Sequence, residues 1–295
     1  MKLNLQRDYK NVILRKIDEK GLKISEKQDV EIRIIHYYAY LRKKAFEGPH
    51  KVVKSKEFLC PDEVKKGFEK LENIIKNGGD IAPYFNRTAA DLTKYDDMFS
   101  DWGIMHFHLG DELIPGENLV KRGNPVLFAY MHDECVYFLN IFKHGHWSDK
   151  EVIQLMYNNW PELLERYLVP EVRSISYEPT SKDIKKLRES GTMYFFDIYD
   201  SKGDKLFLVP PGLGMNTARS SIKDSAFFDD VMNQLRDIEK VIINDEHEIE
   251  KWMLANGIEK KQEISFELTD FNPNELILVD KYNGFSYSYL LKVTQ

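Results

Sequence analysis

Residues 125–143 read PVLFAYMHDECVYFLNIFK, two apolar runs separated by the polar segment MHDE. Both runs are rich in β-branched and aromatic residues, which are enriched in strands. A short polar segment between two such runs is typical of a β-hairpin. We therefore predict an antiparallel hairpin here. The hairpin lies between two pairs of histidines in the sequence, so its fold determines whether the two pairs come close together.

Four of the eight histidines occur as two His-x-His pairs on either side of this hairpin. The first pair, His106 and His108, belongs to the segment IMHFH, which we predict to be a strand. The second pair is His144 and His146, directly after the hairpin. Residues two apart in a strand point to the same face. An antiparallel meander of these segments would therefore bring four imidazoles toward one site.

Outside this region the chain mixes helices with further hairpins. Helices are predicted over residues 30–47, 61–77, 148–164, 181–190, 221–240 and 245–257, and strands over 192–199, 205–209, 264–268, 276–280 and 285–291. Apolar spacing of three or four residues indicates the helices, and an Asn283-Gly284 turn indicates the last hairpin. Pro161 is expected to kink or divide its helix. The pattern as a whole predicts an α+β fold.

A chain of 295 residues is long enough for about two domains. We predict a helical N-terminal region (1–95), a sheet-plus-helix unit with the His-x-His pairs (96–175) and a C-terminal α+β portion (176–295). The first boundary is placed where helical spacing gives way to strand patterns, and the second lies in a connection between predicted elements.

The charge balance excludes a globally basic nucleic-acid binder. The chain has 42 Lys and Arg against 48 Asp and Glu, a net charge of −6, which leaves room only for a local basic site. Two cysteines give no disulfide framework. The sequence has no apolar run long enough for a membrane span and no secretory leader pattern. We therefore expect a cytoplasmic protein without a membrane partner.

The paired histidines suit acid–base chemistry on RNA, without a cofactor. One imidazole would take the proton of a ribose 2′-hydroxyl, while another would protonate the leaving 5′-oxygen. Arg122 and Lys143 lie near the pairs in sequence and would bind the phosphate. Arg219 would help, because it follows the Gly-rich segment 210–217, which leads into a predicted helix, and helix N-termini attract phosphate.

Two other interpretations of the histidines remain open. The four imidazoles could form a site for zinc or another transition metal in a hydrolase, completed by Asp111, Glu112 or Asp133. Alternatively, the histidines could be structural, in a non-catalytic binding, sensor or assembly module that forms oligomers. If the purified protein contains metal and loses it when both His-x-His pairs are mutated, the metal-site interpretation is favoured.

The region from His106 to Trp147 resembles the sheet of RelE/HigB-like mRNA interferase toxins. The matching elements are a strand, a basic loop residue, an apolar strand, an acidic turn and a strand with a basic end, here 106–110, Arg122, 126–130, 133–134 and 136–144. The resemblance implies metal-independent RNA cleavage in a bacterial toxin or phage-defence role, with a neutralising protein or defence partner. It also implies that Arg122 binds phosphate and that Lys143 and His144 lie near the scissile bond.

A second similarity concerns the 2H phosphoesterases, which place two His-x-Thr pairs on neighbouring strands. Here His108 and His146 stand at the positions of the hydroxyl residues. Both resemblances imply phosphodiester chemistry, so the favoured interpretation is an endoribonuclease with His106, His108, His144 and His146 as the acid–base groups. A homo-oligomer is one of the expected assemblies.

Overall fold

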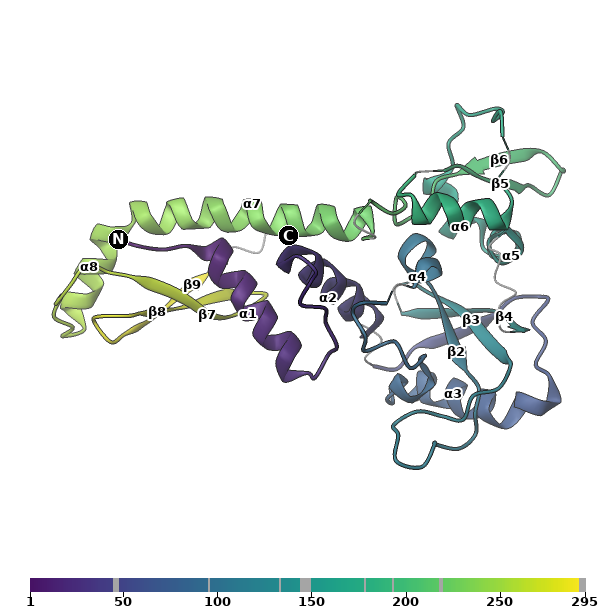
Figure 1. The fold of residues 1–295 in the computed structure, drawn as a ribbon, viewed down its shortest axis with the longest axis horizontal. Coiled ribbons are helices and arrows are strands. Elements are labelled where there is room, and N and C mark those ends of the chain that lie inside the picture. The colour runs from purple at the N-terminus through teal and green to yellow at the C-terminus, as the bar shows by residue number, and fades with distance from the viewer. Residues whose placement is uncertain are drawn as a thin grey trace. The chain divides into compact units, whose positions relative to one another are not determined.

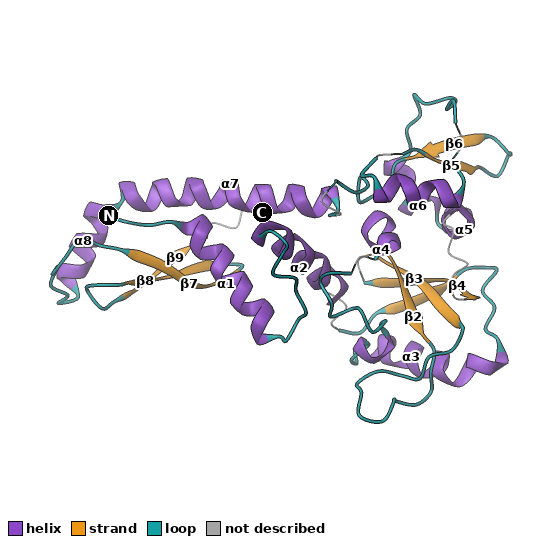
Figure 2. Cartoon of the chain, in the orientation of Figure 1, coloured by secondary structure: helices purple, strands orange, loops and turns teal. Residues whose placement is uncertain are grey.

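The computed structural model of the chain is an α+β fold, which confirms the predicted class (Figures 1 and 2). It describes residues 1–44, 48–94, 96–132, 134–143, 150–177, 179–192, 194–217 and 220–291. Within these residues lie eight α-helices and three small sheets. The chain divides into two compact units, unit 1 (Met1–Tyr37 with Ser225–Gln295) and unit 2 (Tyr38–Asp224).

This division differs from the three predicted segments. Both predicted boundaries, near residues 95 and 175, fall inside unit 2. A strand from the predicted helical region joins the central sheet of unit 2, and the helix that begins at Ser181 lies in the same unit. Unit 1 combines the two ends of the chain, which meet at a bridge between Lys2 and Ser265. Pairing between such distant segments leaves no local pattern in the sequence.

The predicted hairpin is confirmed and lies in the middle of a four-stranded sheet in unit 2. The strands are β1 (Lys51–Lys54), β2 (Ile104–His108), β3 (Pro125–His132) and β4 (Cys135–Lys143), in the order β1-β4-β3-β2. β2, β3 and β4 form the antiparallel meander that the sequence predicts. β1 has no counterpart among the predicted strands, and it pairs with β4 in parallel.

One face of this sheet packs against α3 (Lys65–Asn77), which follows a 3-10 helix (Asp62–Val64). The buried side chains here come from both elements, namely Phe68, Leu71, Ile75, Met105, Phe107, Leu127 and Phe138. Gly67 allows a close approach of the helix to the end of β2, because a Cβ at this position would lie 1.9 Å from the carbonyl oxygen of Leu109. The helix ends at the left-handed Gly78, as its sequence predicts.

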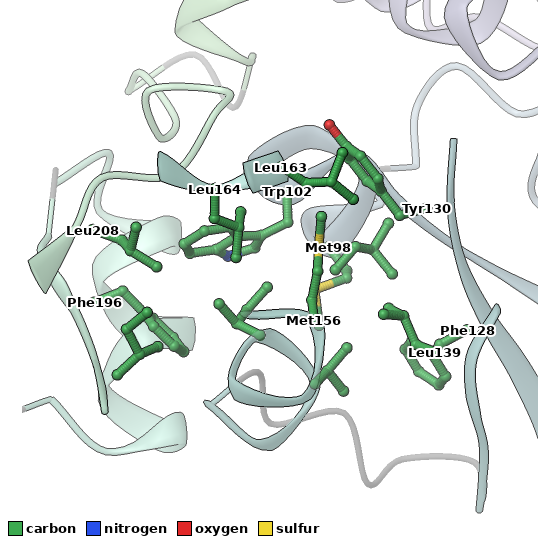
Figure 3. Packing of buried hydrophobic residues seen from close by; sticks show 14 of the residues in the cluster. Met98, Trp102, Phe128, Tyr130, Leu139, Met156, Leu163, Leu164, Phe196 and Leu208 are labelled. Atoms are coloured by element: carbon green, nitrogen blue, oxygen red, sulfur yellow. The ribbon is translucent and has the colours of Figure 1, made fainter. Parts of the chain in front are cut away.

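The opposite face of the sheet borders a second apolar core. It is covered by α4 (Asp97–Trp102), α5 (Lys150–Asn159), α6 (Ser181–Glu189) and the hairpin of β5 (Phe196–Tyr199) and β6 (Lys205–Leu208). Trp102 and Phe196 pack edge to face, with ring centroids 5.1 Å apart (Figure 3). Alternate residues of β2 and β3 therefore serve two different cores, as the period of a strand requires.

Pro161 divides the helix predicted over 148–164. α5 ends at Asn159, and Pro161 begins a 3-10 helix (Pro161–Leu163) that is followed by a second one (Glu165–Tyr167). This is the expected effect of a residue that has no amide hydrogen to donate within a helix. The predicted capping residue Ser148 lies outside the described residues.

Unit 1 is built from α1, α8 and a three-stranded sheet. The bounds are α1 (Leu5–Glu19), α8 (Glu246–Ala255), β7 (Phe266–Asn272), β8 (Glu275–Asp280) and β9 (Ser286–Leu290). α1 is joined to β7 by a hydrogen bond from the amide of Leu268 to the buried carboxylate of Asp8, at 3.3 Å. The predicted Asn-Gly hairpin is confirmed as β8 and β9, with Gly284 at the positive φ of 73°.

Two helices continue from one unit into the other. They are α2 (Val30–Lys44) and α7 (Ile222–Asn244), and both confirm predicted helices. A 3-10 helix (Ala82–Tyr84) completes the elements that concern the site below. Among the residues that the structure describes, no helix combines the length and the apolar character needed to cross a membrane.

Candidate functional site

The register of the meander brings several predicted site residues to one end of the central sheet. His108 pairs with Val126 of β3, and Val126 pairs with Phe142 of β4. Lys143 comes next and is exposed. Because neighbouring strands lie about 4.8 Å apart, the end of β4 is about 10 Å from His108. The segment with His144 and His146, which itself lies outside the described residues, therefore starts at the sheet end where His108 lies.

The first histidine pair consists of one half-buried and one buried side chain. The rings of His106 and His108 have centroids 6.3 Å apart and planes at 77°. His108 is 2% exposed, whereas His106 is half-buried and also packs near Phe128, at 6.2 Å between centroids. His106 is therefore the member of this pair that a bound molecule can reach.

A carboxylate and an ammonium group lie in the neighbourhood of His106. Asp96 is the N-cap of α4, and its Oδ1 accepts from the amide of Phe99 at 3.2 Å. Its Oδ2 accepts from Nζ of Lys43 at 2.7 Å, and these two side chains are only 13% and 14% exposed. We call Lys43, Asp96 and His106 the His106 cluster.

The charges of this cluster act on one another. Burial raises the pKa of Asp96, but the positive charge of Lys43, the proximity of His106 and the hydrogen bonds to the carboxylate outweigh it, so the pKa is lowered overall. Asp96 is therefore an anion at neutral pH. An anionic carboxylate close to an imidazole favours its protonated form, which is the form a general acid needs.

Two cavities adjoin the His106 cluster. They have volumes of about 390 Å³ and about 410 Å³, and both are lined by Lys43, Lys44 and Phe85. A smaller space of about 10 Å³ has all three members of the His106 cluster in its wall. That space is close to what a single water molecule needs. Lys43 thus borders both the larger cavities and the space next to His106.

Arg122 is exposed on the loop before β3, near a second arginine. Burial lowers its pKa, the positive charge of Arg87 lowers it further, and Glu117 opposes both. Nη2 of Arg87 donates to both carboxylate oxygens of Glu117, at 2.9 and 3.0 Å. Since Arg87 also lines the 390 Å³ cavity, Arg122 belongs to the electrostatic surroundings of that cavity.

The Gly-rich segment 210–217 has a clear packing role. A Cβ at Gly212 would lie 1.9 Å from the carbonyl oxygen of Ser100 in α4, and the amide of Gly212 donates to the carbonyl of Asp101 at 2.8 Å. Close packing of this segment on α4 therefore accounts for this glycine. Arg219, predicted to help bind phosphate, lies outside the described residues.

The metal interpretation gains no support from the residues that the structure describes, which hold no group of three or more His, Cys, Asp or Glu suited to a metal ion. Two of the four predicted ligands, His144 and His146, lie outside those residues, so the hypothesis is left to experiment. Asp111 and Glu112 are exposed, and Glu112 pairs with Lys121.

Sequence reasoning missed Asp96 and Lys43, which complete the surroundings of His106. The two residues are 53 positions apart, so no local spacing connects them. Asp96 does carry a local signal, because an aspartate before a helical segment is a frequent N-cap. Lys43 carries none, since a lysine in the last turn of a helix is common for electrostatic reasons alone.

Comparison with known proteins adds no identification. No family model matches the chain, and no curated protein or solved structure is significantly similar to it. The resemblance to the interferase toxins therefore stays a prediction.

Proposed function

We propose that the protein is a metal-independent endoribonuclease in which His106 is the accessible acid–base group. The observation that carries the proposal is the His106 cluster, in which Asp96 pairs with Lys43 at 2.7 Å, and whose Lys43 also lines two larger cavities. The cluster offers a proton donor and a cation within a partly enclosed space. Enclosure strengthens such electrostatic interactions, because they are screened less than in water.

In this proposal the ribose 2′-oxygen attacks the phosphorus atom and the bond from phosphorus to the 5′-oxygen breaks. The products are a 2′,3′-cyclic phosphate and a 5′-hydroxyl. His106, which interacts electrostatically with Asp96, would donate the proton to the leaving 5′-oxygen. His144 or His146, which come directly after β4 in the sequence, would take the proton of the 2′-hydroxyl.

Cations near the cluster would hold the phosphate in place. Lys43 is the nearest, and Arg122 and Lys143 lie on the loop before β3 and at the end of β4. A protein with a net charge of −6 needs such a local concentration of positive charge to bind RNA. The buried His108 would position the strand rather than touch the substrate.

The biological setting belongs to the same proposal. Uncontrolled cleavage of cellular RNA is toxic, so the activity fits a toxin or phage-defence role in the cytoplasm. It would then require a neutralising protein or another control by a partner. Self-association would be one way to enlarge the basic surface of an acidic chain.

Incubation with labelled RNA pools, with and without EDTA, tests the proposal. We expect cleavage that EDTA does not affect and that the His106→Gln substitution reduces about 100-fold or more. His247→Gln is the matched control, because His247 is exposed on α8 in the other unit. Cleavage that disappears with EDTA would instead indicate the metal-dependent hydrolase, and no cleavage of any pool would favour the binding or assembly module.

A further inference from the structure

The 390 Å³ cavity next to the His106 cluster has the properties of a ligand site. Its wall is formed by the C-terminal end of α2, by residues 82–90 and by residues 117–119. Its volume lies within the range of small-molecule sites, about 300–1,000 Å³. Much of the lining is apolar, contributed by Tyr40, Ala82, Phe85, Ala89, Ala90 and Leu119. Such walls favour a ligand with a flat, weakly polar part.

The polar groups of the same cavity favour a ligand with negative charge. Lys43, Lys44 and Arg87 contribute three positive charges to the lining, and Glu117 contributes one negative charge. Lys44 forms no ion pair with the described residues, whereas Lys43 is held by Asp96 and Arg87 by Glu117. Lys44 is therefore the cation most available to an incoming anion.

Two amide side chains complete the cavity. Asn86 and Asn118 both line it. A side-chain amide can donate and accept at the same time, which suits the edge of a nucleobase. Apolar walls, amide groups and an excess of positive charge are together the chemistry that recognises a nucleotide.

We propose that this cavity binds a single nucleotide unit, with the base between the apolar walls and the phosphate at Lys44 and Arg87. The assignment of that nucleotide to an RNA strand rests on the proposed function, since Lys43 borders both this cavity and the space beside His106. Binding of a free nucleotide does not depend on cleavage.

Calorimetric titration of the full chain with uridine 3′-monophosphate, adenosine 3′-monophosphate and inorganic phosphate tests the inference. At least one nucleotide should bind with a Kd of about 1 mM or below, and phosphate about tenfold more weakly. Equal affinity for phosphate would overturn the inference, because the walls would then contribute nothing. Absence of nucleotide binding at about 10 mM would overturn it as well.

Two substitutions locate the binding in this cavity. Ala90→Trp should abolish it by filling the space, and the exposed position of Ala90 leaves room for the larger side chain. Lys44→Ala should weaken nucleotide binding about tenfold through loss of one charged contact. Lys202→Ala, in the exposed turn between β5 and β6, is the matched control and should change nothing. Unchanged affinity in both cavity variants would contradict the inference.

The outcomes separate this inference from the proposed function. Cleavage of RNA without nucleotide binding in the cavity would remove the inference and leave the ribonuclease in place. Nucleotide binding that Ala90→Trp abolishes, in a protein that cleaves no RNA, would support the cavity and remove the ribonuclease.

Discussion

Two carboxylates, one at each end of the short helix α4, have very different surroundings. Asp101 is fully buried, and its Oδ2 accepts from Nε of Arg188 at 2.5 Å and from the hydroxyl of Tyr194 at 2.8 Å. Asp96 pairs with Lys43 and borders a small space next to His106. The first carboxylate is enclosed by protein, whereas the second borders a space with room for about one water molecule.

The comparison shows that the two carboxylates have different roles. A charge inside an apolar core must be neutralised by close partners, or its burial costs several kcal/mol. Arg188 and Tyr194 provide such partners at Oδ2 of Asp101, and they connect α4 with α6 and with the segment before β5. We therefore interpret the Asp101 group as structural and the His106 cluster as the site of chemistry.

Loss of Arg188 should have the largest effect on stability. Arg188→Met removes the buried partner of Asp101, and we expect the free energy of unfolding to fall by about 3–5 kcal/mol. Urea denaturation measures the change. Arg173→Met, at an exposed position, is the control and should stay within about 0.5 kcal/mol of the wild type. A loss below about 1 kcal/mol would mean that the Asp101 ion pair does not stabilise the core.

The close packing on α4 gives the next largest effect. Gly212→Ala places a Cβ against the carbonyl of Ser100, and the resulting shift should cost about 1–3 kcal/mol in thermal or urea unfolding. Gly123→Ala is the matched control, since a Cβ there meets its nearest neighbour only at 3.7 Å. Equal stability of the two variants would show that the segment around Gly212 does not hold α4 in place.

Substitutions of Asp96 separate its structural role from its charge. Asp96→Ala removes both the helix cap and the partner of Lys43, and should cost about 1–2 kcal/mol of unfolding free energy. Asp96→Asn keeps a good capping group and should cost less. Both variants should lose RNA cleavage in the proposed mechanism. If Asp96→Asn keeps full cleavage, the charge of Asp96 has no part in the chemistry.

The smallest expected effect is a change in the unfolding free energy at low pH. The pKa of Asp96 is lower in the folded protein than its ordinary value, so its contribution is present above that ordinary value and is lost as the pH falls through the folded value. The difference in unfolding free energy between wild type and Asp96→Asn should therefore shrink as the pH falls below about 4. A difference that grows on acidification would contradict the lowered pKa.

Local patterns were enough to predict much of the fold. The apolar runs on either side of MHDE predict β3 and β4, and the His-x-His spacing predicts a strand that becomes β2. The α+β class and the antiparallel meander follow from these elements. β1 was missed because Val52 and Val53 stand between lysines, which is a short pattern without a clear period. These residues form a strand because they pair in parallel with β4.

The candidate site could be predicted only in part. The sequence singled out His106 and His108, but it could not show that one is buried and the other reachable, because both have the same spacing. It could not connect Asp96 with Lys43, or Asp101 with Arg188, across 53 and 87 residues. Such pairs form where the fold brings distant helices together. The structural role of Asp101 therefore becomes visible only when its partner Arg188 is known.

The central claim is that the His106 cluster performs the chemistry while the Asp101 group holds the core. Its most direct test is to measure RNA cleavage per folded molecule and unfolding free energy for His106→Gln and Arg188→Met in parallel. We predict that His106→Gln loses about 100-fold or more in cleavage with little change in stability, and that Arg188→Met does the reverse. Full cleavage by a folded His106→Gln protein would contradict the account.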